Sequence, residues 1–256
     1  MRTKIGFGEG TSPVIFGDSL IVNWDHEGDS FIACLDAKTG NEKWRVDRAE
    51  GTTWATPLVV EHNGATQVVT TARNRTRSYD LASGRLVWEC GGQAGNPIPS
   101  PVTLDGLVYC MTGFRGFALH AISLDAKGDI TDSDKIAWRR DDAAPYIASP
   151  LLYDDLLYFT KERNGILFCV DASSGDAHYS DKRLGGINML YASLAGAGGK
   201  IYIVGRDGTT VVLKHGREYE VLATNQLEEG IDASPAIVGD SLYLRGQKHL
   251  YCIAND

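Results

Sequence analysis

The chain of 256 residues lacks an apolar run of membrane-spanning length, and its opening stretch, MRTKIGFGEG, lacks the apolar segment of a signal peptide. It has only five cysteines, none in a C-x-x-C pair, which argues against a zinc cluster or a dense disulfide framework. Positive charge is not in excess: the formal net charge is −8, which argues against nucleic acid as a partner. Apolar residues at helical spacing are scarce, whereas 29 glycines favour short strands joined by turns.

A Ser/Thr-Pro-apolar signal recurs with a period of about 44 residues. Its prolines are Pro13, Pro57, Pro101, Pro150 and Pro235, with spacings of 44, 44, 49 and 85. The last gap is about two periods long, and the intermediate copy is YASLAG, in which Leu194 replaces the proline. Periods of this length are typical of solenoids and propellers.

A second signal, Asp-x-x-Ser/Thr-Gly followed by an aromatic residue four positions after the glycine, runs in phase with the first. The aromatic residues are Trp44, Trp88 and Tyr179, and an insertion delays the third unit's copy to Trp138. The aspartate can accept hydrogen bonds from the backbone two residues on, and the glycine supplies a positive φ, so the signal predicts a hairpin turn. We expect the aromatic side chain to cover the seam between adjacent repeats.

Within each unit, apolar residues alternate with period two between turn residues, which predicts four antiparallel strands per unit. The predicted fold is all-β: a β-propeller of six four-stranded antiparallel blades in a single domain. The expected blades cover approximately residues 12–50, 51–95, 96–145, 146–189, 190–230, and 231–256 together with 1–8. The last unit stops after its third strand, so we expect residues 1–8 to supply the fourth strand and close the ring. The alternative is a piece of a longer propeller.

The tetrapeptide Gly-Asp-Ser-Leu, which carries the nucleophile in one esterase family, occurs twice, with its serines at Ser19 and Ser241. Both copies fall on the turn between the first two strands of a unit. Other units have no serine at this position, as in the Asp154-Asp155 turn. A hydrolase nucleophile requires a strand–turn–helix context and a partner histidine. The pattern therefore indicates a repeat turn rather than an active site.

These repeats resemble those of PQQ-like (quinoprotein-like) β-propellers, and the uncharacterised bacterial members look closest. The residues that carry the resemblance are Asp36, Thr39, Gly40, Trp44, Asp80, Ser83, Gly84, Trp88, Asp171, Ser174, Gly175 and Tyr179. The resemblance covers nearly the whole chain. The family includes PQQ- and calcium-dependent alcohol and glucose dehydrogenases, and also a non-enzymatic lipoprotein propeller of the outer-membrane assembly machine. It implies the fold and an extracytoplasmic, periplasmic or secreted, location.

The dehydrogenase site does not transfer to this sequence. The alcohol dehydrogenases of the family carry an adjacent Cys-Cys pair, which this chain lacks, and no stretch matches their calcium ligands or catalytic aspartate. We therefore expect no catalytic residue, no metal ligand and no cofactor, with PQQ plus calcium as the alternative.

The loops between the second and third strands of the units share one face of a propeller, here called the loop face, and most of them carry a basic residue. The candidate binding residues are Trp54, Arg73, Arg115, Lys161, Arg163, Arg206 and Arg245. The first such loop carries Asp25 and His26 instead. Arginines around a channel mouth would suit a protein partner or an anionic small molecule or polymer. The plainer interpretation is that polar loops simply carry charges.

The sequence thus predicts a non-catalytic binding or assembly scaffold that acts through its loop face or channel mouth. The rival hypothesis is a quinoprotein-type oxidoreductase or a sugar- or polymer-active propeller enzyme with an unrecognised site. Two further expectations concern packing. Cys34, Cys169 and Cys252 share one repeat position and should be free buried thiols. The acidic insertion at residues 125–134 lacks the residue order of a calcium loop and should be a solvated turn.

Overall fold

The computed structural model describes residues 3–254, and this part of the chain contains 24 strands and no helix. The strands form two compact units, Met1–Ala144 and Pro145–Asp256. Every pairing between successive strands within a sheet is antiparallel, as between β1 and β2, where Val14 lies opposite Ile21. The all-β, propeller-type fold predicted from the repeats is confirmed, and the six sheets agree with the six predicted blades.

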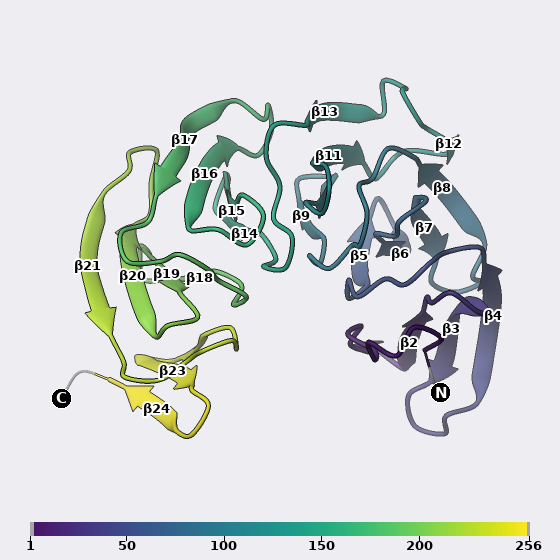
Figure 1. The fold of residues 1–256 in the computed structure, drawn as a ribbon. Helices are drawn as coiled ribbons and strands as arrows, with labels where there is room; N and C mark the ends of the chain where they lie inside the picture. Colours follow the sequence, from purple (N-terminus) through teal and green to yellow (C-terminus); the bar gives the residue numbers. More distant parts are fainter. Residues whose placement is uncertain (1–2, 255–256) are drawn as a thin grey trace. The chain divides into compact units, whose positions relative to one another are not determined.

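Unit 1 contains three of these sheets, which we call blades 1 to 3 (Figure 1). Blade 1 is built from β1 (Val14–Phe16), β2 (Ser19–Trp24), β3 (Ser30–Asp36) and β4 (Glu42–Arg48). Blade 2 is built from β5 (Leu58–His62), β6 (Ala65–Thr70), β7 (Thr76–Asp80) and β8 (Leu86–Cys90), with β12 (Gly128–Asp129) added outside β8. Blade 3 is built from β9 (Val102–Leu104), β10 (Leu107–Thr112), β11 (Ala118–Ser123) and β13 (Ile136–Arg140).

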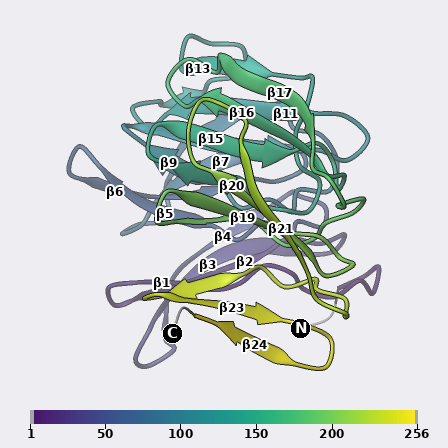
Figure 2. The ribbon, with the colours of Figure 1, turned by 90° about the vertical axis from the view of Figure 1, so that its left-hand side faces the viewer.

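Unit 2 contains blades 4 to 6. Blade 4 is built from β14 (Leu151–Tyr153), β15 (Leu156–Thr160), β16 (Ile166–Asp171) and β17 (Ala177–Arg183). Blade 5 is built from β18 (Ala195–Ala197), β19 (Lys200–Val204), β20 (Thr209–Lys214) and β21 (Val221–Gln226). Blade 6 is built from β22 (Ala236–Val238), β23 (Ser241–Arg245) and β24 (Leu250–Ile253), and Figure 2 shows β23 and β24 side by side. Ser19 and Ser241 begin β2 and β23 directly after hairpin turns, so the Gly-Asp-Ser-Leu stretches are turns of two blades.

The expected fourth strand of blade 6 is not formed by the described part of the N-terminal segment. Residues 3–13 contain no strand, and residues 1–2 of the expected strand lie outside the described residues. Gly6 and Gly8 have φ values of +72° and +80°, which an extended strand does not contain. The closure of a ring and the blade boundaries remain predictions.

The repeated Asp-x-x-Ser/Thr-Gly signal forms the turn that the sequence predicts. In blade 1, Asp36 Oδ1 accepts hydrogen bonds from the Thr39 N–H (2.8 Å) and the Thr39 hydroxyl (2.9 Å). Gly40 has a φ of +74°, and its N–H donates to the Asp36 carbonyl at 2.8 Å. These bonds from Thr39 lower the pKa of Asp36. This carboxylate therefore stabilises its own turn.

Tryptophans cover the seams between blades in unit 1, as expected. The Trp44 Nε1–H of blade 1 donates to the Leu81 carbonyl of blade 2 at 2.8 Å. A Cβ added to Gly84 would lie 2.7 Å from the Trp44 ring, so glycine is needed for this contact as well as for its φ of +72°. Trp88 of blade 2 is fully buried and packs with Val108 and other residues of blade 3.

The Ser/Thr of the repeated Ser-Pro signal also links neighbouring blades. The Ser12 N–H donates to the Thr56 hydroxyl at 3.2 Å, 44 positions along the chain. In unit 2, the Ser149 N–H donates to the Ser193 hydroxyl (3.0 Å), and the Ser193 N–H donates to the Ser234 hydroxyl (2.9 Å). The signal thus supplies a relay of hydrogen bonds between the segments that enter successive blades.

The acidic insertion is exposed over most of its length, as expected, but it also contains a short strand and a buried apolar residue, which the sequence did not predict. Its strand β12 pairs in parallel with β8, with Gly128 opposite Trp88. Ile130 is 2% exposed and belongs to the apolar cluster around Trp88. Asp129 accepts a hydrogen bond from Arg75 Nη1 at 2.8 Å. The insertion therefore covers the outer edge of blade 2 because it brings an apolar residue and a matched charge to that edge.

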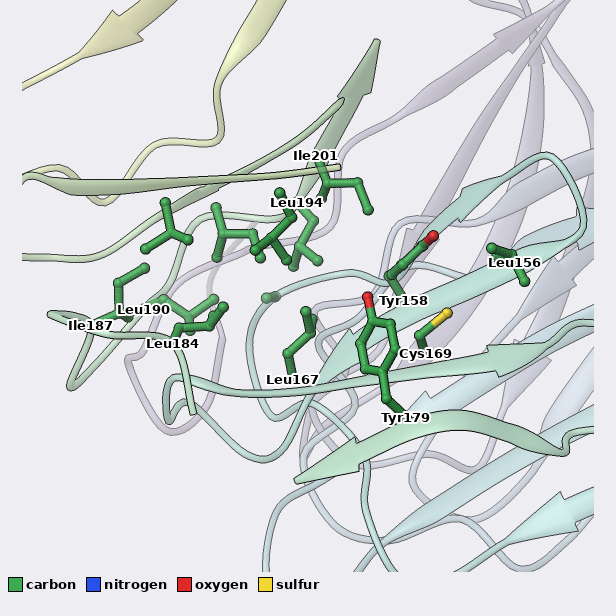
Figure 3. Packing of buried hydrophobic residues seen from close by; sticks show 14 residues of the cluster. Leu156, Tyr158, Leu167, Cys169, Tyr179, Leu184, Ile187, Leu190, Leu194 and Ile201 are labelled. Carbon is green, nitrogen blue, oxygen red and sulfur yellow. The ribbon is translucent and has the colours of Figure 1, made fainter. Parts of the chain in front are cut away.

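The cysteines follow the predicted repeat position, but they are not all buried. Cys34 lies opposite Ile21, and Cys169 lies opposite Tyr179, on paired strands. Both side chains are buried in apolar clusters, and Figure 3 shows Cys169 beside Tyr158 and Tyr179. All five thiols are free, and four are buried. Cys252 is exposed, so its predicted burial is wrong. The reason is that β24 is the last strand of its sheet and no further strand of the described chain covers it.

We predict that one thiol of the five reacts in the native protein. Burial raises the pKa of Cys90 and Cys169 to about 11 and that of Cys110 to about 12, so these thiols stay protonated and inaccessible. Titration with Ellman's reagent at pH 8 should release about one equivalent rapidly, and the Cys252→Ser variant should release none. Rapid reaction of two or more thiols in the folded protein would contradict the packing described.

Candidate functional site: an arginine cavity on the loop face

Three loops of unit 1 line an open pocket of about 400 Å³ on the loop face, here called the arginine cavity. The loops are the β6–β7 loop, the segment between β8 and β9, and the β10–β11 loop. The lining residues are Arg73, Asn74, Gln93, Ala94, Gly95, Asn96, Phe114 and Arg115. The structure therefore brings together two of the predicted binding residues, Arg73 of blade 2 and Arg115 of blade 3.

Hydrogen bonds fix the wall of the arginine cavity that blade 3 provides. Gly95 and Phe114 form an antiparallel β-bridge. The Ala94 N–H donates to the Thr112 hydroxyl at 2.7 Å, and that hydroxyl donates to Gln93 Oε1 at 3.1 Å. The segment that enters blade 3 is thus tied to the β10–β11 loop, and the wall is preformed.

The wall of blade 2 is anchored through Asn74. Its N–H donates to Glu50 Oε2 at 2.8 Å, and its Nδ2 donates to the Ala49 carbonyl at 2.9 Å. Glu50 is buried and also pairs with Arg77. The loop that carries Arg73 is therefore held at a defined position beside the linker between blades 1 and 2.

Two lining residues adopt the left-handed backbone conformation without being glycine. Asn96 has a φ of +51° and Arg115 a φ of +55°. Asparagine tolerates this region, whereas an arginine in it costs of order 1 kcal/mol and persists only where its surroundings impose it. The Arg115 guanidinium lies 5.1 Å from the centroid of the Phe114 ring, within the range of a cation–π contact. The strain and the ring together orient Arg115.

The two arginines of the cavity differ from most others in unit 1. Six described arginines of this unit pair with carboxylates: Arg45, Arg48, Arg75, Arg77, Arg139 and Arg140. Arg73 and Arg115 are exposed, and no carboxylate is among the residues that line their cavity. Within the described part of unit 1, these two guanidinium groups are available to an external anion.

The predicted residues of unit 2 have different surroundings. Arg206 forms a two-pronged pair with Asp232, at 2.5 and 3.1 Å, and stacks 4.1 Å from the Tyr191 centroid. A hydrogen bond to Asp232 raises the pKa of Arg206, so this cation already has its counter-charge. Arg245 lines a smaller cavity of about 210 Å³ that also contains Asp232.

Lys161 and Arg163 both lie in the β15–β16 loop of blade 4, where Lys161 is half-buried and Arg163 is exposed. Trp54, the remaining predicted residue, packs between loops. Its backbone N–H donates to the Pro97 carbonyl at 2.8 Å, and a Cβ added to Gly10 would lie 2.5 Å from the Trp54 ring. A binding role for each of these residues remains a proposal.

The sequence did not reveal a buried ion pair beside this face, between Asp25 and Arg48. Arg48 Nε lies 2.8 Å from Asp25 Oδ1, and both side chains are at most 1% exposed. Arg48 also donates to the Tyr79 hydroxyl (2.6 Å) and to Thr70 Oγ1 (3.1 Å) in blade 2. Burial favours a lower pKa of Arg48, but the Asp25 carboxylate outweighs it and the pKa is raised. The sequence suggested that Asp25 is an exposed charge of a loop. Instead, its carboxylate holds Arg48, which links blade 1 to blade 2.

No group of three His, Cys, Asp or Glu side chains in residues 3–254 is arranged to hold a metal ion. Nor does this stretch include a helix with the length and apolar character needed to span a membrane. The polar groups that converge in the arginine cavity are guanidinium and amide groups, which donate hydrogen bonds to anions and to peptide carbonyls.

Antiparallel blades with these turn and seam motifs define a β-propeller protein of the PQQ-like repeat class. The family model described as outer membrane protein assembly factor BamB matches residues 28–256, and the chain belongs to this family. It is 23% identical to outer membrane protein assembly factor BamB of Legionella pneumophila (strain Paris) over 177 residues. This match spans 65% of the chain and 42% of the relative, so less than half of the relative is covered.

Solved structures resemble the chain at low sequence identity. The quinohemoprotein alcohol dehydrogenase from Comamonas testosteroni is 16% identical, with 97% of this chain and 46% of that chain covered and a TM-score of 0.62. A europium-containing methanol dehydrogenase is 10% identical, with 86% and 51% covered and a TM-score of 0.62. BamB from Moraxella catarrhalis is 15% identical, with 96% and 95% covered and a TM-score of 0.47. The likeness to the two dehydrogenases concerns the fold alone.

We predict that Arg48→Met lowers the free energy of unfolding by about 3–5 kcal/mol, because Asp25 then remains buried without a partner. The double variant Arg48→Met/Asp25→Leu should recover most of this loss. Urea unfolding followed by tryptophan fluorescence measures both effects. The control, Arg45→Met, removes an exposed pair with Glu42 and should cost less than about 1 kcal/mol. An Arg48→Met loss no larger than that of the control would contradict the role of the pair.

Proposed function

We propose that this chain is a non-catalytic binding or assembly scaffold that engages another protein through its loop face. The observation that carries the proposal is the arginine cavity, in which two exposed guanidinium groups from adjacent blades line one preformed site. Family membership supports the same function, since the relatives are named for outer membrane protein assembly. From that name we infer that the chain acts outside the cytoplasm.

In unit 1, the loop face gathers two exposed cations on one pocket, whereas the repeated aspartates of the opposite face serve their own turns. On the opposite face, the aspartates of the repeated turns accept hydrogen bonds from their own turns, as Asp36 and Asp171 do. These bonds lower the pKa of both carboxyl groups. On the loop face, Arg73 and Arg115 have no such internal use among the described residues. Exposed charge without an internal partner is what an interface with a charged partner requires.

Site-specific photo-crosslinking in the source bacterium tests this proposal. A benzophenone amino acid is placed at Asp29 and at Arg163, which are exposed in the β2–β3 and β15–β16 loops of the predicted loop face. It is also placed at Lys38 and Ser173, which are exposed in the turns at the opposite ends of the same two blades. We expect the loop-face positions to capture one and the same envelope protein and the turn positions to capture none. Capture from the turn positions only, or from no position, would refute the proposal.

The rival enzymatic function predicts binding of PQQ with calcium. We expect the melting temperature to move by less than about 1 °C when both are added at 100 µM. A cofactor present at 100 times its Kd would instead stabilise the protein by about 2.7 kcal/mol and raise the melting temperature by several degrees. Differential scanning fluorimetry, with each ligand alone as a control, gives the answer. A saturable rise that requires both ligands would establish cofactor binding and overturn the non-catalytic assignment.

A further inference from the structure

We propose that the arginine cavity binds the side-chain carboxylates of an acidic segment of the partner protein. This inference rests on the proposed function, since it specifies the chemistry of the partner that the loop face receives. Arg73 and Arg115 supply the charge, and the polar and aromatic groups around them supply the selectivity for a peptide.

The electrostatic argument begins with the shortage of positive charge. The chain has a formal net charge of −8, and most arginines of unit 1 are used in internal ion pairs. The carboxylates beside the cavity are already used within the chain, since Glu50 pairs with Arg77 and Glu27 accepts hydrogen bonds from Thr52. Arg73 and Arg115 therefore remain as cations of the lining without a carboxylate among the lining residues. A carboxylate that binds there would neutralise positive charge and accept hydrogen bonds from a guanidinium group.

The identity of the positively charged groups favours a carboxylate. A guanidinium presents its N–H groups in a planar fork that matches the two oxygens of a carboxylate. Unit 2 contains this geometry within the chain itself, where Arg206 holds both oxygens of Asp232. We infer that a glutamate or aspartate of the partner forms the same two-pronged hydrogen-bonded pair with Arg73 or Arg115.

The remaining lining favours a peptide over a free anion. The amide of Asn74 uses its Nδ2 on the Ala49 carbonyl, which leaves Oδ1 suited to accept a bond from a peptide N–H. The side chains of Gln93 and Asn96 add further amide groups, and Phe114 adds an aromatic surface. Inorganic phosphate offers no apolar group for the ring. The volume of about 400 Å³ lies at the lower end of the range typical of small-ligand sites.

The cavity is also preformed, which lowers the entropic cost of binding. The Gly95–Phe114 bridge and the Ala94–Thr112 hydrogen bond fix one wall, and the Glu50–Asn74 hydrogen bond fixes the other. Binding then requires the ordering of the two arginine side chains and of the incoming segment only.

Fluorescence anisotropy tests this inference with a labelled hexapeptide of alternating glutamate and phenylalanine. The comparison peptide has glutamine in place of each glutamate. We expect the full chain to bind the acidic peptide at least tenfold more tightly than the glutamine peptide. The double variant Arg73→Gln/Arg115→Gln should lose at least tenfold in affinity for the acidic peptide. Equal binding of the two peptides, or unchanged binding by the variant, would overturn the proposal.

A matched control separates the site from the net charge. Lys38→Gln/Arg85→Gln removes the same amount of charge from exposed turns of the opposite face and should change affinity less than twofold. Both double variants should melt within about 2 °C of the parent chain, since they alter exposed side chains. A loss in the control equal to that in the cavity variant would show general charge attraction and would refute a specific site.

Inorganic phosphate at matched ionic strength provides the competing anion. We expect it not to displace the acidic peptide at concentrations up to 10 mM, whereas efficient displacement would identify a phosphate site and overturn the peptide assignment. The peptide-binding result and the crosslinking result test the two proposals separately. If peptide binding fails while Asp29 and Arg163 still crosslink to an envelope protein, the carboxylate assignment falls and the scaffold function stands.

Discussion

The seam between adjacent blades is the constraint on which the rest of this structure depends. A single four-stranded blade cannot cover both of its faces, so each blade is stable only against a neighbour. Between blades 1 and 2 the seam is closed by different chemistry at different places. At the turns, the Trp44 indole N–H donates a hydrogen bond to the Leu81 carbonyl, and in the interior the Arg48 guanidinium donates to the Tyr79 hydroxyl. Where the chain enters the two blades, the Ser12 backbone N–H donates to the Thr56 hydroxyl. Aromatic packing, a buried ion pair and a hydrogen-bond relay thus act together.

The same seams determine where a binding site can exist. The arginine cavity lies where blades 2 and 3 meet at the loop face, and its walls are continuations of the contacts between strands and loops. Two of its backbone N–H groups, those of Ala94 and Asn74, already donate to Thr112 and Glu50 before any ligand arrives. A loop site built in this way has the rigidity that protein recognition needs, because the scaffold, rather than the ligand, pays most of the ordering cost.

The sequence predicted those features whose chemistry is local. The turn at Asp36 and the seam tryptophan Trp44 depend on residues a few positions apart, and both appear as expected. The parallel strand β12 was not predicted, because its pairing with β8 depends on a partner about 40 residues away. Periodicity predicted that the arginines share one face, but it could not show which of them had partners. Arg206 and Arg115 occupy comparable loops, yet Asp232 neutralises only Arg206. Ion pairing is a tertiary property, and it decides which repeated charges are structural.

The distribution of charge decides which loops of a propeller are free to act on other molecules. A propeller supplies rigid loops, and function depends on which groups those loops leave uncommitted. In the described part of unit 1, carboxylates such as Asp25, Asp36 and Glu50 are held by the chain itself. Around the arginine cavity the uncommitted groups are the guanidinium groups of Arg73 and Arg115, which can attract an acidic surface. Recognition, rather than chemistry on a substrate, is the use that this arrangement favours.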